Sequence, residues 1–339
     1  NERTIDKGER LYEIQTFFGN KFRITEKHPI LIHRNNKNYW VAPENIKKTD
    51  EFVFPFPKLS GNLPFKSVLK LKDDSGYSKE IKINDFFFRF LGYWIGDGFT
   101  NNHHNTERIG LVFNAKDKKL CEYYKNNIKN NFKISSISEN KHNGANYLYW
   151  RDKPFRIWLS RFFRREWKGK VLPSWFLGIS KNQFREFLEG WIESDGHIDE
   201  MGRTTITTKE RDLAMLGQLL ALKFKKMVGV KKIRVDGKTY YKLIIPKSKR
   251  GHSFGSNLLL KPYRFNEIKR PDPRIRLYNI QVEDDESYCT TMASLHNCQI
   301  HNDGKEIRLF TRNMEDVTKQ FPDVVRIAKE NIKGKNYII

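Results

Sequence analysis

Two stretches of the sequence resemble each other, and each is an apolar run that ends in Asp-Gly. They cover residues 90–98 and 187–196. Read as helices, both carry small residues four positions apart on one face, namely Gly92 and Gly96, then Gly190 and Ser194. Small residues at this spacing allow two helix backbones to approach closely. The repeat therefore predicts two helices that pack against each other.

Each predicted helix ends in an acid, Asp97 in the first and Asp195 in the second. The C-terminal end of a helix is negative, so a carboxylate there is disfavoured by roughly 0.3–1 kcal/mol. Two such carboxylates at the base of a helix pair repel each other unless a cation lies between them. Oxygen ligands completed by water suit Mg²⁺, and metal clusters of this kind stabilise the attacking and leaving oxygens at a phosphodiester. One such motif alone is also a common helix stop, but the duplication favours a site.

The doubled motif resembles that of single-chain LAGLIDADG (DOD-type) homing endonucleases. The resemblance implies a Mg²⁺-dependent hydrolase that cuts both strands of a long, asymmetric DNA site as a monomer. Asp97 and Asp195 would bind the metal, together with Gly96 and Ser194 beside them.

The resemblance also implies lysines near the metal. In the family, one lysine precedes a Val-Leu-Pro stretch, and Lys170 matches it. A lysine there could activate the attacking water or neutralise charge on the phosphate. The second comes from a strand in the second half, for which Lys242 is the candidate.

The charge of the chain fits a nucleic-acid partner. The 339 residues carry a formal charge of +23, with a sequence pI near 9.7, which indicates a polyanionic partner. No apolar run reaches the roughly 18–20 residues needed to span a bilayer, and no signal peptide is visible. The three cysteines have no C-x-x-C spacing, so neither zinc nor a disulfide framework is indicated. We expect a cytoplasmic protein with no membrane partner.

Each motif helix is followed by the same predicted pattern, namely a strand, a helix and a hairpin. In the first half we expect a strand at 109–113, a helix from 114 to about 130, and a hairpin of 133–137 with 147–150. In the second half we expect a strand at 203–207, a helix to about 226, and a hairpin of 231–235 with 240–245. Asp236-Gly237 is a strong type I′ turn signal. In Lys231 to Val235, apolar and basic residues alternate, so one face could be buried while the other contacts a duplex, although a solvated face is the simpler alternative.

The segments around the halves are less regular. Residues 58–88 read as a connector in which Asn84 or Asp85 could cap the first motif helix. Residues 151–165 read as an amphipathic helix with a cationic side. The prediction is a pseudo-symmetric unit with two antiparallel sheets, and the family implies two αββαββ-like halves.

Both ends of the chain are predicted to form strands, and five residues there can take part in specific chemistry. An asparagine such as Asn297 can cyclise and cleave the chain after itself. A histidine such as His296 can assist by protonating the leaving group, and Cys298 can act as a nucleophile. Near the other end, Thr25 and His28 form Thr-x-x-His before Pro29.

This arrangement resembles an intein in which a homing endonuclease interrupts an all-β Hint-type splicing domain. The resemblance implies a splicing domain from residues 1–60 and 272–297, and an endonuclease from residues 61–271, giving an α+β protein. Thr25 and His28 would activate the first scissile bond, and His296, Asn297 and Cys298 would form the second. No cysteine precedes His28, so we expect autocatalytic splicing by this chain to be incomplete.

Residues 298–339 resemble the adenylation domain of archaeal-type ATP-dependent DNA ligases, with a strand, an Asp-Gly turn and a second strand. Arg312, in Phe-Thr-Arg-Asn, would contact the nucleotide, so ATP is a cofactor only of a complete host ligase. The resemblance implies that the DNA target is the ligase gene without the inserted intein, across the insertion point. Two alternatives stay open at this point: a LAGLIDADG module that binds DNA or RNA without cutting it, and an element that only splices.

Overall fold

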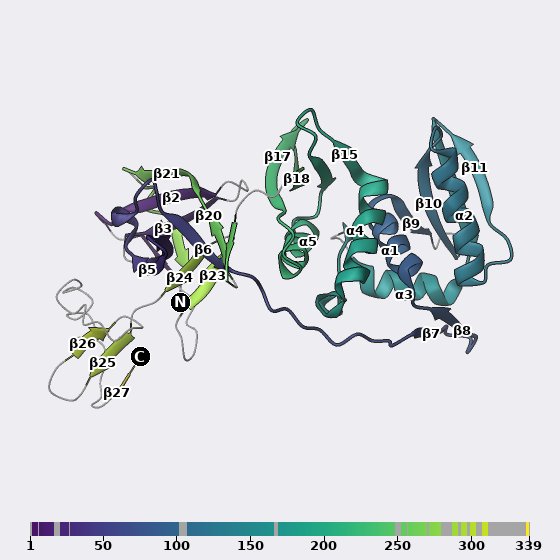
Figure 1. Cartoon of the computed structure of the whole chain (residues 1–339). Coiled ribbons are helices and arrows are strands. Elements are labelled where there is room, and N and C mark those ends of the chain that lie inside the picture. Colours follow the sequence, from purple (N-terminus) through teal and green to yellow (C-terminus); the bar gives the residue numbers. More distant parts are fainter. Residues whose placement is uncertain are drawn as a thin grey trace. The chain divides into compact units, whose positions relative to one another are not determined.

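The computed structural model describes most of the chain, namely residues 2–5, 7–16, 21–26, 28–101, 107–165, 169–247, 252–255, 257–269, 271–278, 287–290, 293–296, 299–302, 307–310 and 337–338. The chain divides into two units (Figure 1). One consists of Asn1–Pro55 with Gly251–Ile339, and the other of Phe56–Arg250.

The middle unit contains the predicted repeat. The first half consists of α1 (Asp85–Asp97), β9 (Gly98–Asn101), β10 (Arg108–Asn114), α2 (Lys118–Phe132), β11 (Ser138–His142) and β12 (Ala145–Arg151). The second consists of α4 (Lys181–Asp195), β15 (Gly196–Ile198), β16 (Thr204–Thr208), α5 (Arg211–Lys223), β17 (Gly229–Val235) and β18 (Lys238–Ile245). Their sheets have the same strand order, β11-β12-β10-β9 and β17-β18-β16-β15. The repeat is confirmed, and each half adds a short strand directly after its aspartate.

The segment between β12 and α4 links the two halves. This segment contains α3 (Lys153–Phe163), β13 (Arg164–Arg165), β14 (Gly169–Lys170) and the 3₁₀ turn η3 (Ser174–Gly178). The amphipathic helix predicted at 151–165 is α3, and Asp152 caps it by accepting a hydrogen bond from the Phe155 amide at 3.2 Å.

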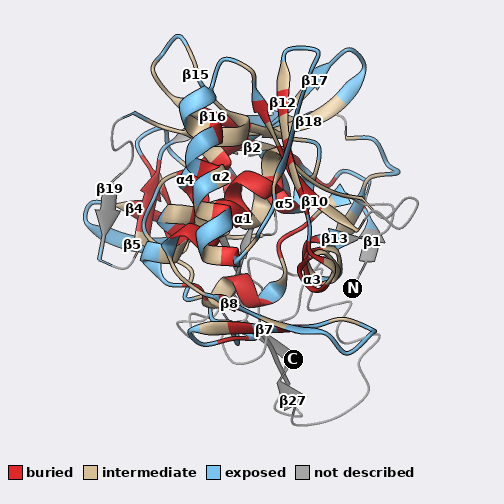
Figure 2. Ribbon diagram, turned by 90° about the vertical axis from the view of Figure 1, so that its right-hand side faces the viewer, coloured by how far each residue is buried: buried red, intermediate tan, exposed pale blue. Residues whose placement is uncertain are grey.

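The motif helices start at side-chain caps. Asn84 accepts a hydrogen bond from the Phe87 amide at 3.0 Å, which confirms it as the cap of α1. Ser180 and Gln183 form a reciprocal capping box at the start of α4. Most of α1 is buried, as the red ribbon in Figure 2 shows. It is therefore the centre of the core of this unit.

Two local predictions in this unit were wrong. The hairpin strand expected at 133–137 begins only at Ser138, because Lys133 ends α2 in the left-handed region, with φ of 52°. The connector expected at 58–88 contains a hairpin, β7 (Val68–Lys72) with β8 (Ser78–Lys82). Its apolar residues are buried in the core, namely Leu69, Leu71 and Ile81.

The other unit is built of strands in its described part, apart from one 3₁₀ turn, η1 (Pro43–Asn45). A seven-stranded sheet joins β19 (His252–Phe254), β20 (Asn257–Leu260), β6 (Glu51–Pro55), β4 (Ile30–Arg34), β24 (Ala293–His296) and β23 (Ser287–Thr290), with β5 (Lys37–Val41) on β4. A three-stranded sheet contains β21 (Pro262–Ile268), β2 (Leu11–Thr16) and β3 (Lys21–Thr25). The pair of β1 (Glu2–Thr4) with β22 (Arg276–Tyr278) is separate.

These pairings correct the predicted boundary at residue 271. Strands β20 and β21 pair with β6 and β2, so residues 257–268 belong with the N-terminal strands and not with the middle unit. Near the C-terminal end, where strands are expected, β23 and β24 pair as a hairpin.

The chain after residue 298 contributes a separate small sheet. It joins β25 (Gln299–Asn302), β26 (Ile307–Phe310) and β27 (Tyr337–Ile338). The antiparallel pairing of β25 with β26 confirms the two predicted strands, whereas the Asp-Gly turn expected between them lies outside the described residues. Within the described part of the chain, no helix is both long and apolar enough to cross a bilayer.

Candidate metal and nucleic-acid site

The helices α1 and α4 cross with their backbones in contact. They lie side by side in Figures 1 and 2. A methyl group added to Gly92 would collide with the carbonyl oxygen of Phe187, and one added to Gly190 would collide with that of Arg89. The small residues at four-residue spacing therefore lie at the crossing, as the sequence predicts.

The crossing brings the acidic ends of the two helices together. A methyl group on Gly96 would lie only 3.0 Å from the carboxyl carbon of Asp195, and Asp97 directly follows Gly96. Burial, and then the negative charge of Asp97, raise the pKa of Asp195 to about 6. Burial also raises the pKa of Asp97. A bound cation would favour the charged form of both carboxyl groups, so the place where they meet is a candidate cation site.

Lys170 lies at the same place. From β14 its Nζ donates hydrogen bonds to the carbonyl oxygens of Trp94 and Gly96, at 2.8 Å and 2.7 Å. These carbonyls belong to the last turn of α1, and that of Trp94 also accepts a hydrogen bond from the amide of the C-cap residue Gly98. Burial lowers the pKa of Lys170 to about 8, although the charges of Asp195 and Asp97 oppose this. The structure thus brings together three of the residues predicted from the sequence.

Two other predicted site residues, Gly96 and Ser194, also lie where the helices end, but their oxygen and hydroxyl groups have other partners. The Gly96 carbonyl already accepts from Lys170, and the Ser194 hydroxyl donates to the Trp191 carbonyl at 3.1 Å. Lys242 lies in the middle of β18, between Thr207 and Lys231 of the neighbouring strands. Among the described lysines, Lys170 and not Lys242 has a charge that partly offsets the rise in the pKa of both aspartates.

The donor set fits Mg²⁺ better than zinc. The described residues contain no group of three or more His, Cys, Asp or Glu side chains arranged to hold a metal. The protein would therefore supply two carboxylates, Asp97 and Asp195, and water would supply the remaining ligands. Mg²⁺ usually keeps several waters, whereas zinc prefers nitrogen and sulfur ligands.

An ionic contact between the helices was not predicted. Arg89 of α1 forms a two-pronged ion pair with Glu193 of α4, which also accepts a hydrogen bond from the Tyr124 hydroxyl at 2.8 Å. Glu193 lies two residues before Asp195, so this contact fixes the register in which the helices deliver their acids. The only signal in the sequence is a lone arginine inside the apolar run from Phe86 to Ile95.

Each sheet turns one face to the core and leaves the other face open. In the second sheet Ile206, Leu243 and Val230 lie in one cross-strand row and are buried. By strand alternation, Lys231 and Lys242 point to the opposite face. Ile233 and Val235 share that face, and Val235 is 48% exposed, so the expectation that the apolar residues of this strand are buried was wrong.

The strand-built unit brings the two ends of the predicted splicing motif near each other. Thr25 Oγ1 lies 3.1 Å from His28 Nδ1. Leu295 pairs with Ile30, so the end of β24, which carries His296, lies beside the start of β4. Asn297, Cys298 and Arg312 lie outside the described residues, and their assignments stay predictions.

The raised pKa of Asp195 predicts that the metal affinity of the site depends on pH. Asp195 must lose its proton to bind a cation, and its pKa is about 6 in the metal-free protein. Mn²⁺ or Mg²⁺ affinity should fall by about tenfold for each pH unit below 6 and level off above it. Because the folded pKa lies above the ordinary value, the metal-free protein should also lose stability as the pH rises through 6. Calorimetric titration at pH 5, 6 and 7.5 measures the affinity.

Two variants serve as controls for this prediction. Asp195→Asn should bind the metal weakly at every pH and should show no step in affinity near pH 6. Glu189→Gln, which removes an exposed acid from the same helix, should retain it. An affinity that is constant from pH 5 to 7.5 in the unmodified chain would contradict the placement of Asp195.

Part of the chain matches a known protein family. Residues 182–258 match the model of the LAGLIDADG-like domain. This range begins in α4 and includes Asp195 and Lys242, so the matched segment carries the second of the two crossing helices.

Two relatives that match most of the length of this chain are replication proteins. The chain is 24% identical over 290 residues, 82% of its length, to the Replication factor C small subunit of Thermococcus kodakarensis. It is 24% identical over 287 residues to the protein of the same name from Methanocaldococcus jannaschii. The matches cover only 30% and 14% of those two proteins.

A shorter match is closer in sequence. Over 40 residues, 12% of the chain, the identity to the DNA ligase of Nanoarchaeum equitans is 50%, and the match covers 7% of that protein. Among solved structures, that of I-DmoI in complex with DNA and Mn is similar with a TM-score of 0.36 and 14% identity. This similarity covers 48% of this chain and 89% of that one.

Proposed function

We propose that this chain, which contains a LAGLIDADG-like domain, is an intein-borne, Mg²⁺-dependent endonuclease that cuts both strands of a specific DNA site. The observation that carries the proposal is the meeting of two half-buried acids and one lysine where α1 and α4 end. Such a group has no structural purpose that an apolar contact would not serve better.

The residues of the site have distinct roles in this proposal. Asp97 and Asp195 hold the metal, which when bound supplies Lewis-acid stabilisation and an acidified water. Lys170 keeps its ammonium group at the end of α1, where it offsets negative charge on the phosphate. Its pKa of about 8 also lets it exchange a proton near neutral pH. The open faces of the two sheets hold the duplex.

A cleavage assay tests this proposal. The chain is incubated with Mg²⁺ or EDTA and three plasmids, which carry an uninterrupted ligase sequence, an uninterrupted Replication factor C sequence, or neither. We expect Mg²⁺-dependent linearisation of the ligase plasmid at one site. Binding without cutting on all three plasmids would favour the alternative, a LAGLIDADG module without catalysis.

The ligase is the proposed host. The 40-residue match to a DNA ligase has about the length of residues 298–339, and the antiparallel pair β25–β26 agrees with the two strands expected there. The 290-residue match to Replication factor C leaves room for little more than that segment. One element placed in two unrelated proteins accounts for both matches.

Protein splicing is the second activity that the structure favours. The pairing of β24 with β4 and the contact of Thr25 with His28 are what a reaction between distant chain segments requires. Mass spectrometry of the incubated chain would detect a species that ends at Asn297. If no such species ever forms, splicing is excluded.

A further inference from the structure

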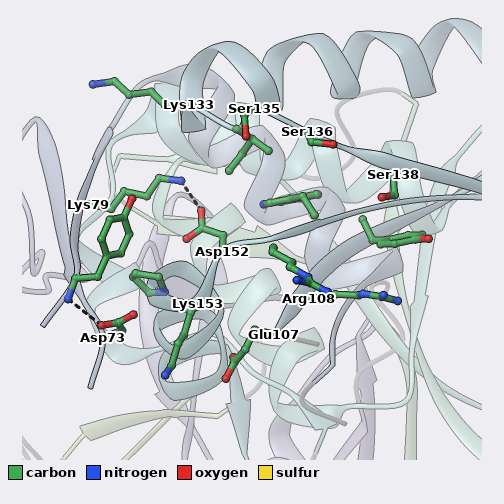
Figure 3. A pocket seen from close by; sticks show the side chains of 16 residues that line it. Asp73, Lys79, Glu107, Arg108, Lys133, Ser135, Ser136, Ser138, Asp152 and Lys153 are labelled. Carbon is green, nitrogen blue, oxygen red and sulfur yellow. Dashed lines mark hydrogen bonds and ion pairs between the residues drawn. The ribbon is translucent and has the colours of Figure 1, made fainter. Parts of the chain in front are cut away.

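A hollow with a basic lining lies in the first half, at the end of the sheet β11-β12-β10-β9 where β10 begins. It has a volume of about 790 Å³ and is walled by the β7–β8 hairpin, the start of β10, the segment between α2 and β11, and the turn from β12 into α3 (Figure 3). Its lining contains five lysines and arginines but only three acids. The hollow therefore favours an anion.

All three acids already have partners. Asp152 pairs with Lys79, as Figure 3 shows, and Glu107 pairs with Arg156. Asp73 accepts hydrogen bonds from the amides of Ser75 and Tyr77, each at 3.0 Å. The remaining cations of the hollow thus gain little neutralisation from its own carboxylates.

Two of these cations oppose each other directly. Arg108 of β10 is the cross-strand partner of Arg151 of β12, and neither has a carboxylate partner among the described residues. Like charges at directly opposed positions destabilise a sheet. The Arg108 guanidinium also lies 4.8 Å from the centre of the Tyr149 ring, which holds it in place. A fixed, unfavourable arginine pair is what an anion site contains before its ligand binds.

The hollow is separate from the metal site. Leu111 of β10 pairs with Gly98, which follows Asp97. Arg108 lies three residues further along the strand, about 10 Å away at the usual rise per residue. Both arginines point to the open face of the sheet, because the next pair, Ile109 with Trp150, is buried.

We infer that this hollow binds phosphates of the DNA backbone where the duplex continues past the first sheet. Arg108 and Arg151 hold the phosphodiester, and the hydroxyls of Ser135, Ser136 and Ser138 border the same hollow. The β7–β8 hairpin, which lies outside the repeated halves, completes its wall. The inference rests on the DNA binding in the proposed function but not on cleavage.

The test is the double variant Arg108→Gln with Arg151→Gln, assayed for binding to duplex DNA between 50 and 200 mM salt. Each lost phosphate contact should lower the slope of log affinity against log salt by about 1. Binding at low salt should weaken about tenfold or more. The melting temperature should be unchanged or slightly higher, because a like-charge pair has been removed.

The control is Lys70→Gln on the same hairpin, where the lysine side chain is 82% exposed and outside the hollow. A double variant with the salt slope of this control would overturn the inference. So would a site that takes only free anion: inorganic phosphate would then stabilise the unmodified chain, and the double variant would bind DNA normally. Failure of the unmodified chain to bind any DNA would instead overturn the proposed function.

Discussion

Replacing Asp97 or Asp195 by asparagine should lower the rate of DNA cleavage by at least about 10²–10³-fold, the loss typical of one group that stabilises a transition state. Asparagine keeps the size and one oxygen of the side chain but removes the charge that holds a divalent cation. Binding of duplex DNA should remain and should still depend strongly on salt, because in the proposed function the sheets, and not the acids, contact the DNA backbone. Plasmid linearisation and gel-shift titration measure the two effects separately.

The matched control for these variants is Glu189→Gln, which removes one negative charge from an exposed position of α4. It should leave the cleavage rate within about twofold, as expected for a surface change away from the site. If both asparagine variants still cut both strands at the rate of this control, the aspartates do not hold the metal and the endonuclease assignment fails.

Replacing Gly190 by alanine should destabilise the middle unit by about 1–3 kcal/mol or more, which is typical of overpacking. The added methyl group would collide with the carbonyl oxygen of Arg89 and lie 2.9 Å from the amide nitrogen of Tyr93. Both atoms belong to the backbone of α1, so the clash can be relieved only by moving the helices apart. Chemical unfolding followed by tryptophan fluorescence measures the loss.

The control for this prediction is Gly217→Ala on α5. There the methyl group would lie 3.0 Å from the Trp191 ring and 3.1 Å from Leu243, which are side chains and can adjust. Alanine also gains about 1 kcal/mol of helix propensity over glycine. A loss in Gly190→Ala no larger than that in Gly217→Ala would show that the close helix contact is not what holds the unit together.

Separation of the helices should also weaken the site. The helix crossing brings Asp97 close to Asp195. It also brings Arg89 close enough to Glu193 to form their ion pair. Gly190→Ala should therefore lose metal affinity even under conditions in which it remains folded. Mn²⁺ titration of the folded variant measures this coupling.

The sequence alone determined the features that are local. The period of the apolar residues located the helices α1 and α4, the small residues located the face on which they meet, and the ends of the apolar runs located both acids. Asn84 as a cap and the hairpin turn at Asp236-Gly237, where φ is 49° and 74°, could also be predicted. In each case the physical cause lies within a few residues of the position concerned.

Only the tertiary structure decided which distant segments meet. It joined β20 and β21 to the N-terminal strands, brought Arg89 to Glu193, and folded residues 68–82 into a hairpin that walls a basic hollow. It also placed Lys170, and not Lys242, at the aspartates. The physical reason is that strand partners and ion pairs are selected by register and by complementary surfaces far apart in the chain, and no local period of the sequence records either.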